Sequence, residues 1–354
     1  MRTIPDLLLY CRPGFEHECA QEVVAIAGAY GTAPQGTAHV AAGYVTFSSP
    51  PQARINGDWR RHIFARQCLP VFAMLDDLPR ADRLTPIMQA LNARGECFSD
   101  AWVEAPETDE GKALAPFCKS FGNALIGGLK KARLLDPNAP HRLHAFFPRS
   151  DHVYLASADP ACTAPWPQGI PRLKFPREAP SRSTLKLEEA LLVLLNERER
   201  ERWLKPGMSA VDLGAAPGGW TWQLVRRSLR VTAVDNGPMA SGLLQSGLVT
   251  HRREDGFRFR PARAVDWMVC DMVEQPRRIA ELVARWLGAG WCRYAIFNLK
   301  LPMKKRFEES QRCLKMITEA APAGADLRAR QLYHDREEIT VFARLATRKE
   351  PARR

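Results

Sequence analysis

Apolar runs alternate with stretches of helical spacing through the second half of this 354-residue chain. Four of the runs are expected strands, at Ser209–Leu213, Arg230–Val234, Trp267–Cys270 and Tyr294–Leu299. Two further strands, Leu327–Tyr333 and Ile339–Leu345, close the chain and are expected to pair antiparallel. Because strands that alternate with helices assemble into parallel sheets covered on both faces, the pattern predicts a mostly parallel α/β sheet.

A long helix is expected before these strands, over Thr184–Trp203. Its apolar residues recur at the spacing of a helix face that packs on a core, at Leu187, Ala190, Leu191, Leu194 and Leu195. Ser183 is suited to the N-cap position of this helix. Lys186 then lies in the first turn, where the helix dipole disfavours a cation. Such a local conflict favours a functional reason for Lys186.

The first half of the chain mixes strands and helices without regular alternation. The expected strands are Asp6–Cys11, Gly43–Phe47, Ala101–Glu104, Arg142–Phe147 and His152–Ala156. The expected helices are Phe15–Ile26, Thr85–Ala93 and Ala115–Leu135, the last weakened by three glycines. The last two strands are expected to pair across the turn at residues 148–151. This half is therefore predicted to be α+β.

Residues 165–180 read PWPQGIPRLKFPREAP, with prolines at positions 165, 167, 171, 176 and 180. Proline breaks helices and removes a backbone donor from a strand, so this segment is expected to be neither. We interpret it as a linker between an amino-terminal region, residues 1–164, and a carboxyl-terminal domain, residues 181–354.

The charge of the chain narrows its partners. Lys and Arg number 51 against 39 Asp and Glu, a net charge of +12, which favours nucleic acid or an anionic membrane surface. No apolar run reaches the roughly 20 residues of a membrane span, and the nine cysteines form no C-x-x-C pair. We therefore predict a soluble, cytoplasmic protein with neither a disulfide framework nor a metal site. A two-domain chain of this size can act as a monomer, and we expect one.

The strongest local motif is AVDLGAAPGGW, Ala210–Trp220, in which a strand runs into glycines before an expected helix at Thr221–Ser228. Glycines let the backbone turn sharply and approach a ligand. Asp235 ends the next strand, where an acid can accept hydrogen bonds from ribose hydroxyls. The motif departs from the dinucleotide pattern G-x-G-x-x-G, so nicotinamide binding and a ligand-free tight turn stay open as alternatives.

Four charged residues are expected near the ends of elements on the ligand side of the sheet: Lys186, Asp271, Lys300 and Glu338. Asp271 ends a strand, and Lys300 follows the apolar strand Tyr294–Leu299. Ligands of open α/β sheets bind at such strand ends. Glu338 precedes an alternating strand, whereas its neighbour Glu337 is expected to face the opposite side.

At these residues a resemblance emerges. The motif DLGAAPGGW resembles motif I of S-adenosylmethionine-dependent methyltransferases, in the form found in FtsJ/RrmJ-like RNA 2′-O-methyltransferases. SRSTLKL, residues 181–187, resembles the S-R-x-x-x-K-L signature of the same family. The resemblance implies a Rossmann-like class I methyltransferase sheet with its last strand antiparallel, and S-adenosyl-L-methionine as cofactor. The residues implied to line the cofactor site are Ser183, Ala216, Pro217, Gly218, Gly219, Asp235, Asp255 and Asp271.

Lys186, Asp271, Lys300 and Glu338 resemble the K-D-K-E tetrad of ribose 2′-O-methyltransferases, with Lys300 carried over as the proton acceptor. A free lysine has a pKa of about 10.4, too high for a base at neutrality. A second cation and partial burial lower a lysine pKa, so the two lysines are expected to lower each other's pKa. The signatures of amino-group and cytosine-C5 methyltransferases are absent, which favours a hydroxyl acceptor.

The amino half begins with YCRPGFEHECA, residues 10–20, which resembles RNA-modifying methyltransferases that carry a THUMP domain behind a ferredoxin-like unit. A THUMP-type role implies RNA contacts from a basic segment that contains Lys112, Lys119, Lys130, Lys131 and Arg133. His141 and His144 lack a third ligand, and we interpret them as structural.

Taken together, both halves resemble the RlmM-type (YgdE) ribosomal RNA large-subunit methyltransferases over nearly the whole chain. The resemblance implies 2′-O-methylation of a cytidine in the peptidyl-transferase region of 23S ribosomal RNA, with that RNA or a large-subunit precursor as partner. A non-catalytic RNA-binding or assembly factor is the main alternative, and the net charge of +12 and the separate basic domain motivate it.

Overall fold

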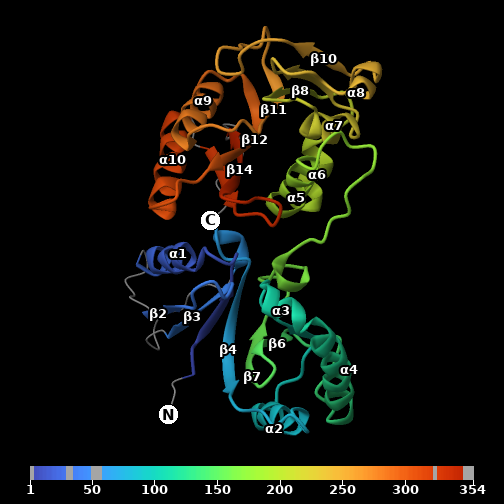
Figure 1. The fold of residues 1–354 in the computed structure, drawn as a ribbon, viewed down its shortest axis with the longest axis vertical. Helices are drawn as coiled ribbons and strands as arrows, with labels where there is room; N and C mark the ends of the chain where they lie inside the picture. The colour runs from blue at the N-terminus through green and yellow to red at the C-terminus, as the bar shows by residue number, and fades with distance from the viewer. Residues whose placement is uncertain (1–3, 29–34, 49–57, 322–324, 346–354) are drawn as a thin grey trace. The chain divides into compact units, whose positions relative to one another are not determined.

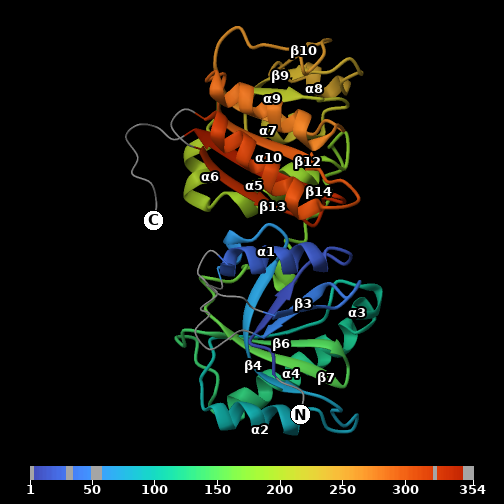
Figure 2. The ribbon, with the colours of Figure 1, turned by 90° about the vertical axis from the view of Figure 1, so that its left-hand side faces the viewer.

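The computed structural model describes residues 4–28, 35–48, 58–321 and 325–345. The chain divides into two compact units, residues 1–171 and 172–354, and the division falls inside the proline-rich segment 165–180. Each unit contains one seven-stranded sheet (Figures 1 and 2). Within the described residues, every helix is too short or too polar to span a lipid bilayer.

The sheet of the carboxyl-terminal unit has the strand order β10-β9-β8-β11-β12-β14-β13. Its strands are β8 (Ser209–Leu213), β9 (Arg230–Val234), β10 (Val249–Arg252), β11 (Val265–Cys270), β12 (Cys292–Lys300), β13 (Ala325–Arg330) and β14 (Glu338–Leu345). The first five strands in this order are parallel, and β14 is antiparallel to both β12 and β13. The expected parallel sheet with an antiparallel last strand is confirmed.

Helices cover both faces of this sheet. They are α5 (Thr184–Leu194), α6 (Glu197–Trp203), α7 (Gly219–Val225), α8 (Ser241–Gln245), α9 (Pro276–Gly288) and α10 (Arg306–Ala320). Helices α9 and α10 lie on one face, and α5, α6 and α7 lie on the other (Figures 1 and 2). Because helices cover both faces of the sheet, ligands are expected to bind at the carboxyl ends of its parallel strands.

One face of the β12–β14 pair changes from apolar to polar along its length. Tyr294 and Ile296 of β12 are buried in the core together with Phe342 of β14. Side chains two residues apart share a face of a strand, so Asn298 and Lys300 continue the row of Ile296 towards the carboxyl end of β12. The apolar part anchors the strand on the core, and the polar part is left at the ligand edge.

The expected helix Thr184–Trp203 is wrong in one respect, because the chain forms two helices there. The first, α5, ends at Leu194, and Leu195 is extended with φ −120° and ψ 133°. Asn196 then caps α6: its side chain accepts a hydrogen bond from Glu199 N at 2.9 Å, and Glu199 Oε2 accepts one from Asn196 N at 3.0 Å. The capping box restarts the helix in a new direction.

Replacing Asn196 with alanine is expected to lower the free energy of unfolding by about 1 kcal/mol, because α6 loses its side-chain cap. The Asn196→Asp variant keeps an oxygen at the same position that can accept the hydrogen bond from Glu199 N, and it should stay near wild type. Urea unfolding followed by circular dichroism measures both variants. Equal losses in the two would show that the cap does not stabilise the fold.

The sheet of the amino-terminal unit has the order β2-β3-β1-β4-β7-β6-β5. Its strands are β1 (Leu7–Tyr10), β2 (Gln35–Ala38), β3 (Tyr44–Ser48), β4 (Gln67–Leu75), β5 (Ala101–Glu104), β6 (Arg142–Arg149) and β7 (His152–Ala158). Its helices are α1 (Glu16–Gly28), α2 (Leu84–Arg94), α3 (Asp109–Ala113) and α4 (Ala115–Lys131), with 3₁₀ turns η1 (Trp59–Arg61) and η2 (Pro167–Gly169). The predicted α+β mixture is confirmed.

Strand β4 joins the two halves of this sheet and was not expected from the sequence. Its first half pairs with β1 and its second half with β7, both antiparallel. Pro70 lies inside it, opposite Leu7, and proline argues against a central strand because it lacks the donor N–H. The prediction for Ala115–Leu135 is also too long, since α4 ends at Lys131 and Arg133 has φ +58°.

Candidate active site

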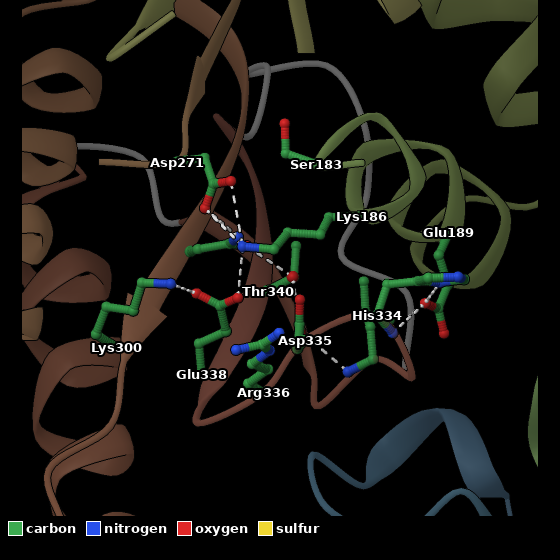
Figure 3. A network of polar contacts seen from close by, with 12 residues as sticks. Ser183, Lys186, Glu189, Asp271, Lys300, His334, Asp335, Arg336, Glu338 and Thr340 are labelled. Atoms are coloured by element: carbon green, nitrogen blue, oxygen red, sulfur yellow. Dashed lines mark hydrogen bonds and ion pairs between the residues drawn. The ribbon is translucent and has the colours of Figure 1, made fainter. Parts of the chain in front are cut away.

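Four charged side chains meet at the carboxyl edge of the second sheet (Figure 3). Lys186 extends from the first turn of α5, and Asp271 follows the last residue of β11. Lys300 ends β12 and Glu338 begins β14. Because β14 runs antiparallel to β12, these two residues are direct cross-strand partners. The topology therefore brings together residues that are up to 152 positions apart (338 − 186).

Glu338 bridges the two lysines. Lys186 Nζ lies 2.6 Å from Glu338 Oε1, and Lys300 Nζ donates to Glu338 Oε2. Lys186 also donates to both carboxylate oxygens of Asp271, at 3.1 and 3.2 Å. The side chain of Glu338 is 2% exposed, that of Lys186 17% and that of Lys300 30%. Lys300 is thus the lysine of the pair that an incoming molecule reaches more easily.

The carboxylates decide the electrostatics of this cluster. Burial lowers the pKa of Lys186, but Asp271 and Glu338 outweigh it and leave this pKa above its ordinary value. Burial raises the pKa of Glu338, and the two lysines reverse this and lower it. Burial also raises the pKa of Asp271, and here Lys186 does not compensate fully. The expectation that the lysines lower each other's pKa is therefore wrong for Lys186 in the ligand-free protein.

The structure separates Glu338 from its neighbour Glu337. Glu337 is exposed, and its Oε1 lies 3.6 Å from Arg306 Nη2. Its carbonyl oxygen accepts a hydrogen bond from Leu301 N at 2.7 Å. Glu338, not Glu337, faces the lysines, as the alternation of side chains along a strand requires.

Sequence reasoning missed the residues behind Asp271. Asn298 donates through Nδ2 to Asp271 Oδ1 at 2.7 Å, and Thr340 Oγ1 lies 2.7 Å from Asn298 Oδ1. The same hydroxyl lies 2.9 Å from Asp335 Oδ2. A signal for Asn298 existed, because it is a polar residue inside an apolar strand and two positions before Lys300. Thr340 and Asp335 carry no comparable signal.

Glu189 is a second residue that sequence reasoning missed. It lies on α5, three residues after Lys186, and is 2% exposed. Its carboxylate accepts hydrogen bonds from Tyr333 N at 2.7 Å and His334 N at 2.9 Å, and lies 2.6 Å from His334 Nδ1 (Figure 3). One helix therefore supplies a lysine to the cluster and also fixes the segment that leads into Glu338.

The loop between β8 and α7 packs closely on its surroundings. Gly214 and Gly218 have φ angles of +75° and +116°, in the region that favours glycine. A Cβ on Gly218 would lie 2.2 Å from Leu243 Cδ1, and a Cβ on Gly219 would lie 2.2 Å from Ser183 Oγ. Gly218 and Gly219 are buried, so this tight strand–helix turn has no room for a side chain at either position. A turn of this kind lets the backbone approach a nucleoside-type ligand closely.

Two acids support this loop. Asp235 follows β9 and accepts hydrogen bonds from Ala216 N at 3.0 Å and Gly237 N at 2.7 Å. Asp212 lies within β8, is buried, and accepts a hydrogen bond from Thr221 Oγ1 at 2.6 Å. Burial raises the pKa of Asp212 to about 7. Asp235 is the more exposed of the two and is left at the edge beside the loop.

The remaining residues implied for the cofactor are placed as follows. Ser183 occupies the N-cap position of α5, but its side chain caps no backbone N–H, and its Oγ lies 2.6 Å from Ser181 Oγ. The prediction that the Ser183 side chain caps this helix is therefore wrong. Pro217 lies between Ala216 and Gly218 in the loop. Asp255 follows β10, is exposed, and accepts a hydrogen bond from Phe257 N at 2.8 Å.

In the amino-terminal unit, the basic residues predicted to contact RNA are all exposed: Lys112, Lys119, Lys130, Lys131 and Arg133. His141 Nδ1 lies 2.6 Å from Glu96 Oε1, and the buried His144 lies 3.0 Å through Nδ1 from Glu104 Oε2. Among the residues that the structure describes, no group of three His, Cys, Asp or Glu side chains has the arrangement of a metal site.

Comparison with known proteins supplies the family. An FtsJ-like methyltransferase model matches residues 179–304, an RlmM ferredoxin-like domain model matches residues 4–69, and a model of the amino-terminal part of ribosomal RNA large subunit methyltransferase M matches residues 82–159. The two amino-terminal matches correspond to the two halves of the first sheet, on either side of β4. The description of this region as THUMP-type stays a prediction.

Curated relatives agree over the full length. A ribosomal RNA large subunit methyltransferase M from Xanthomonas oryzae pv. oryzae (strain PXO99A) is 55% identical over 343 residues, covering 95% of this chain and 98% of the relative. One from Xanthomonas campestris pv. campestris (strain B100) is 55% identical over 342 residues with the same coverage. With the matched FtsJ-like domain and this full-length similarity, the chain belongs to the ribosomal RNA large subunit methyltransferase M family.

Proposed function

We propose that this ribosomal RNA methyltransferase transfers the methyl group of S-adenosyl-L-methionine to the ribose 2′-hydroxyl of a cytidine in the peptidyl-transferase region of 23S ribosomal RNA. The observation that carries the proposal is the cluster of two lysines and two carboxylates beside a glycine cradle at one sheet edge. The choice of cytidine and of its region follows from the resemblance of the sequence to the family.

The four charged residues have separate roles in this proposal. A ribose hydroxyl is a weak nucleophile near neutrality, so a base must take its proton as the methyl is transferred. Lys300 in its neutral form is the proposed base, because it is the more exposed lysine and has one carboxylate partner in the cluster. Lys186 is held by two carboxylates and stabilises negative charge that develops on the oxygen.

Glu338 and Asp271 position the lysines. Glu338 contacts both amines, so it fixes the distance between the proposed base and Lys186. Asp271 orients Lys186 from the opposite side. With both lysines held in place, a ribose hydroxyl that binds between them would meet the base in a fixed orientation. Such positioning can lower the barrier of a bimolecular reaction substantially.

The cofactor is proposed to lie along the carboxyl ends of β8, β9, β10 and β11. The backbone of Ala216–Gly219 would face its methionine part, and Asp235 its ribose. Ser183, Asp255 and Asp271 are the remaining residues that we propose to line the cofactor site. When bound, S-adenosyl-L-methionine supplies an electrophilic methyl on a sulfonium, whose positive charge disfavours a protonated lysine nearby.

The amino-terminal unit is proposed to bind the RNA backbone through Lys112, Lys119, Lys130, Lys131 and Arg133. Phosphate contacts of this kind weaken as salt rises, with little dependence on sequence. The whole chain is proposed to act as a monomer in the cytoplasm.

Methyl transfer from labelled S-adenosyl-L-methionine to 23S ribosomal RNA that lacks the modification tests the proposal. Both free RNA and isolated large-subunit particles should be offered. A 2′-O-methyl group protects the adjacent phosphodiester from alkaline cleavage, so the label should appear in an alkali-stable dinucleotide that contains cytidine. Label on a base would contradict the reaction type, and RNA binding without turnover would favour the non-catalytic assembly factor.

A further inference from the structure

A line of polar side chains runs from Asp271 into the protein interior. Asn298 on β12 and Thr340 on β14 are direct cross-strand partners, and Asp335 lies in the segment that precedes β14. The contacts are Asn298 Nδ2 to Asp271 Oδ1 at 2.7 Å, Thr340 Oγ1 to Asn298 Oδ1 at 2.7 Å, and Thr340 Oγ1 to Asp335 Oδ2 at 2.9 Å. Asp335 and Thr340 lie next to Glu338 in Figure 3.

Counting protons along this line fixes its direction. Asp271 is held by Lys186 and accepts, so Asn298 must present its NH₂ group to it and its carbonyl oxygen to Thr340. Thr340 has one hydroxyl proton and must donate it to that carbonyl. The lone pairs of Thr340 then face Asp335, and two acceptors at 2.9 Å repel unless one of them carries a proton.

The surroundings of Asp335 favour its neutral form. The residue is fully buried, and within the described chain its Oδ1 has no hydrogen-bond partner, while Oδ2 accepts from Leu332 N at 3.0 Å. Burial first, and then the carboxylates of Glu338 and Glu189, raise its pKa well above the ordinary value, against smaller opposing effects of the Leu332 N–H hydrogen bond and of Lys186. Burying an ionised carboxylate with one oxygen that accepts no hydrogen bond costs much free energy, whereas burying the neutral carboxylic acid costs far less.

We propose that Asp335 is present as the neutral carboxylic acid at neutral pH, and that it donates a hydrogen bond to Thr340 and so orders the line Asp335–Thr340–Asn298–Asp271. Asp335, Thr340 and Asn298 are positioning residues, since they act on the reacting groups only through Asp271. The protonation state does not depend on the proposed function, whereas the effect on turnover rests on it.

A neutral Asp335 also leaves the two lysines of the cluster balanced by two carboxylates. Lys186 and Lys300 face the two carboxylates Asp271 and Glu338. An ionised Asp335 would add a third negative charge behind Glu338 and would favour protonated lysines, which opposes their use as a base. A neutral acid gives Thr340 the donor it needs without that charge.

The pH dependence of stability tests the protonation state. An acid whose pKa is higher in the folded protein than in the unfolded chain costs stability as pH rises from its unfolded value, about 3.9. Asp335→Asn keeps a neutral donor and removes the titration. The urea midpoint of Asp335→Asn should therefore rise relative to wild type between about pH 4 and about pH 8. A difference that is flat, or that falls with pH, would overturn the proposal.

A second variant covers the case in which Asp335→Asn fails to fold. Thr340→Val removes the hydroxyl and keeps the shape of the side chain. With a neutral Asp335, the loss in urea midpoint of Thr340→Val relative to wild type should be constant between about pH 3 and about pH 8, because both folded proteins keep the proton. With an ionised Asp335, the loss should grow with pH within this window, because removing the Thr340 hydrogen bond raises the pKa of Asp335 in the variant. Growth of the loss with pH would overturn the proposal.

Turnover tests the positioning role. Thr340→Val is expected to lower kcat about tenfold with little change in KM for RNA, since the line touches only Asp271. Thr340→Ser restores the hydroxyl and should restore kcat. Equal kcat in both variants would exclude the positioning role. If wild type itself transferred no methyl group, the proposed function would fail while the result for the protonation of Asp335 would stand.

Discussion

Replacing Lys300 with alanine is expected to lower kcat for methyl transfer to 23S ribosomal RNA by about 10³-fold, the middle of the range for loss of a general base. The fold should survive, because the Lys300 side chain is 30% exposed and lies at the end of β12. Binding of S-adenosyl-L-methionine should change little. Single-turnover kinetics with saturating cofactor measures the chemical step directly.

Lys300→Arg separates the base from its charge. Arginine keeps the ion pair with Glu338, but it cannot be deprotonated in proteins. A base role therefore predicts a loss close to that of Lys300→Ala. Lys315→Ala is a matched control, because Lys315 lies on α10 and its side chain is 75% exposed. An arginine variant that keeps most of its rate would show that Lys300 acts by charge alone.

Replacing Gly218 with valine is expected to weaken binding of S-adenosyl-L-methionine about 5- to 150-fold, because backbone strain of about 1–3 kcal/mol is transferred to the binding site. Gly218 has φ +116°, and a Cβ there would lie 2.2 Å from Leu243 Cδ1 and 3.1 Å from Met239 Cε. The loop must shift, and its backbone then no longer fits the ligand. Isothermal titration calorimetry measures the affinity.

Gly242→Ala provides the control for this substitution. Gly242 lies on α8 next to Leu243, and a Cβ there would meet no atom within 4 Å. The affinity of the Gly242→Ala protein for S-adenosyl-L-methionine should equal that of wild type. Should Gly218→Val bind S-adenosyl-L-methionine normally, the loop would not be the cofactor cradle. Titration of wild type with NADH tests the nicotinamide alternative in the same instrument.

The sequence predicted best those strands that appear as a short local run of mainly apolar residues. Ser209–Leu213 and Arg230–Val234 match β8 and β9 residue for residue. The missed strand β4 contains Pro70, and its stability comes from pairing with β1 on one half and β7 on the other. Pairing with distant strands is not visible in a local pattern.

The sequence predicted the four charged residues of the candidate site, but not the polar residues that hold them in place. Lys186, Asp271, Lys300 and Glu338 could be selected because each stands near the end of an expected element and because together they resemble the K-D-K-E tetrad. Asn298 and Thr340 are 42 residues apart and meet only through the register of β12 on β14. The direction of the Lys186 pKa depends on the distances to two carboxylates, which spacing along the chain does not supply.

The register of β12 on β14 makes strand length itself a constraint on how this enzyme can evolve. Asn298 and Lys300 face Thr340 and Glu338 as partners, with Ile296 and Phe342 continuing the same row into the core. Deleting or inserting one residue within either strand would move every following side chain to the opposite face. Substitutions can accumulate here, but insertions and deletions should be confined to the connecting loops.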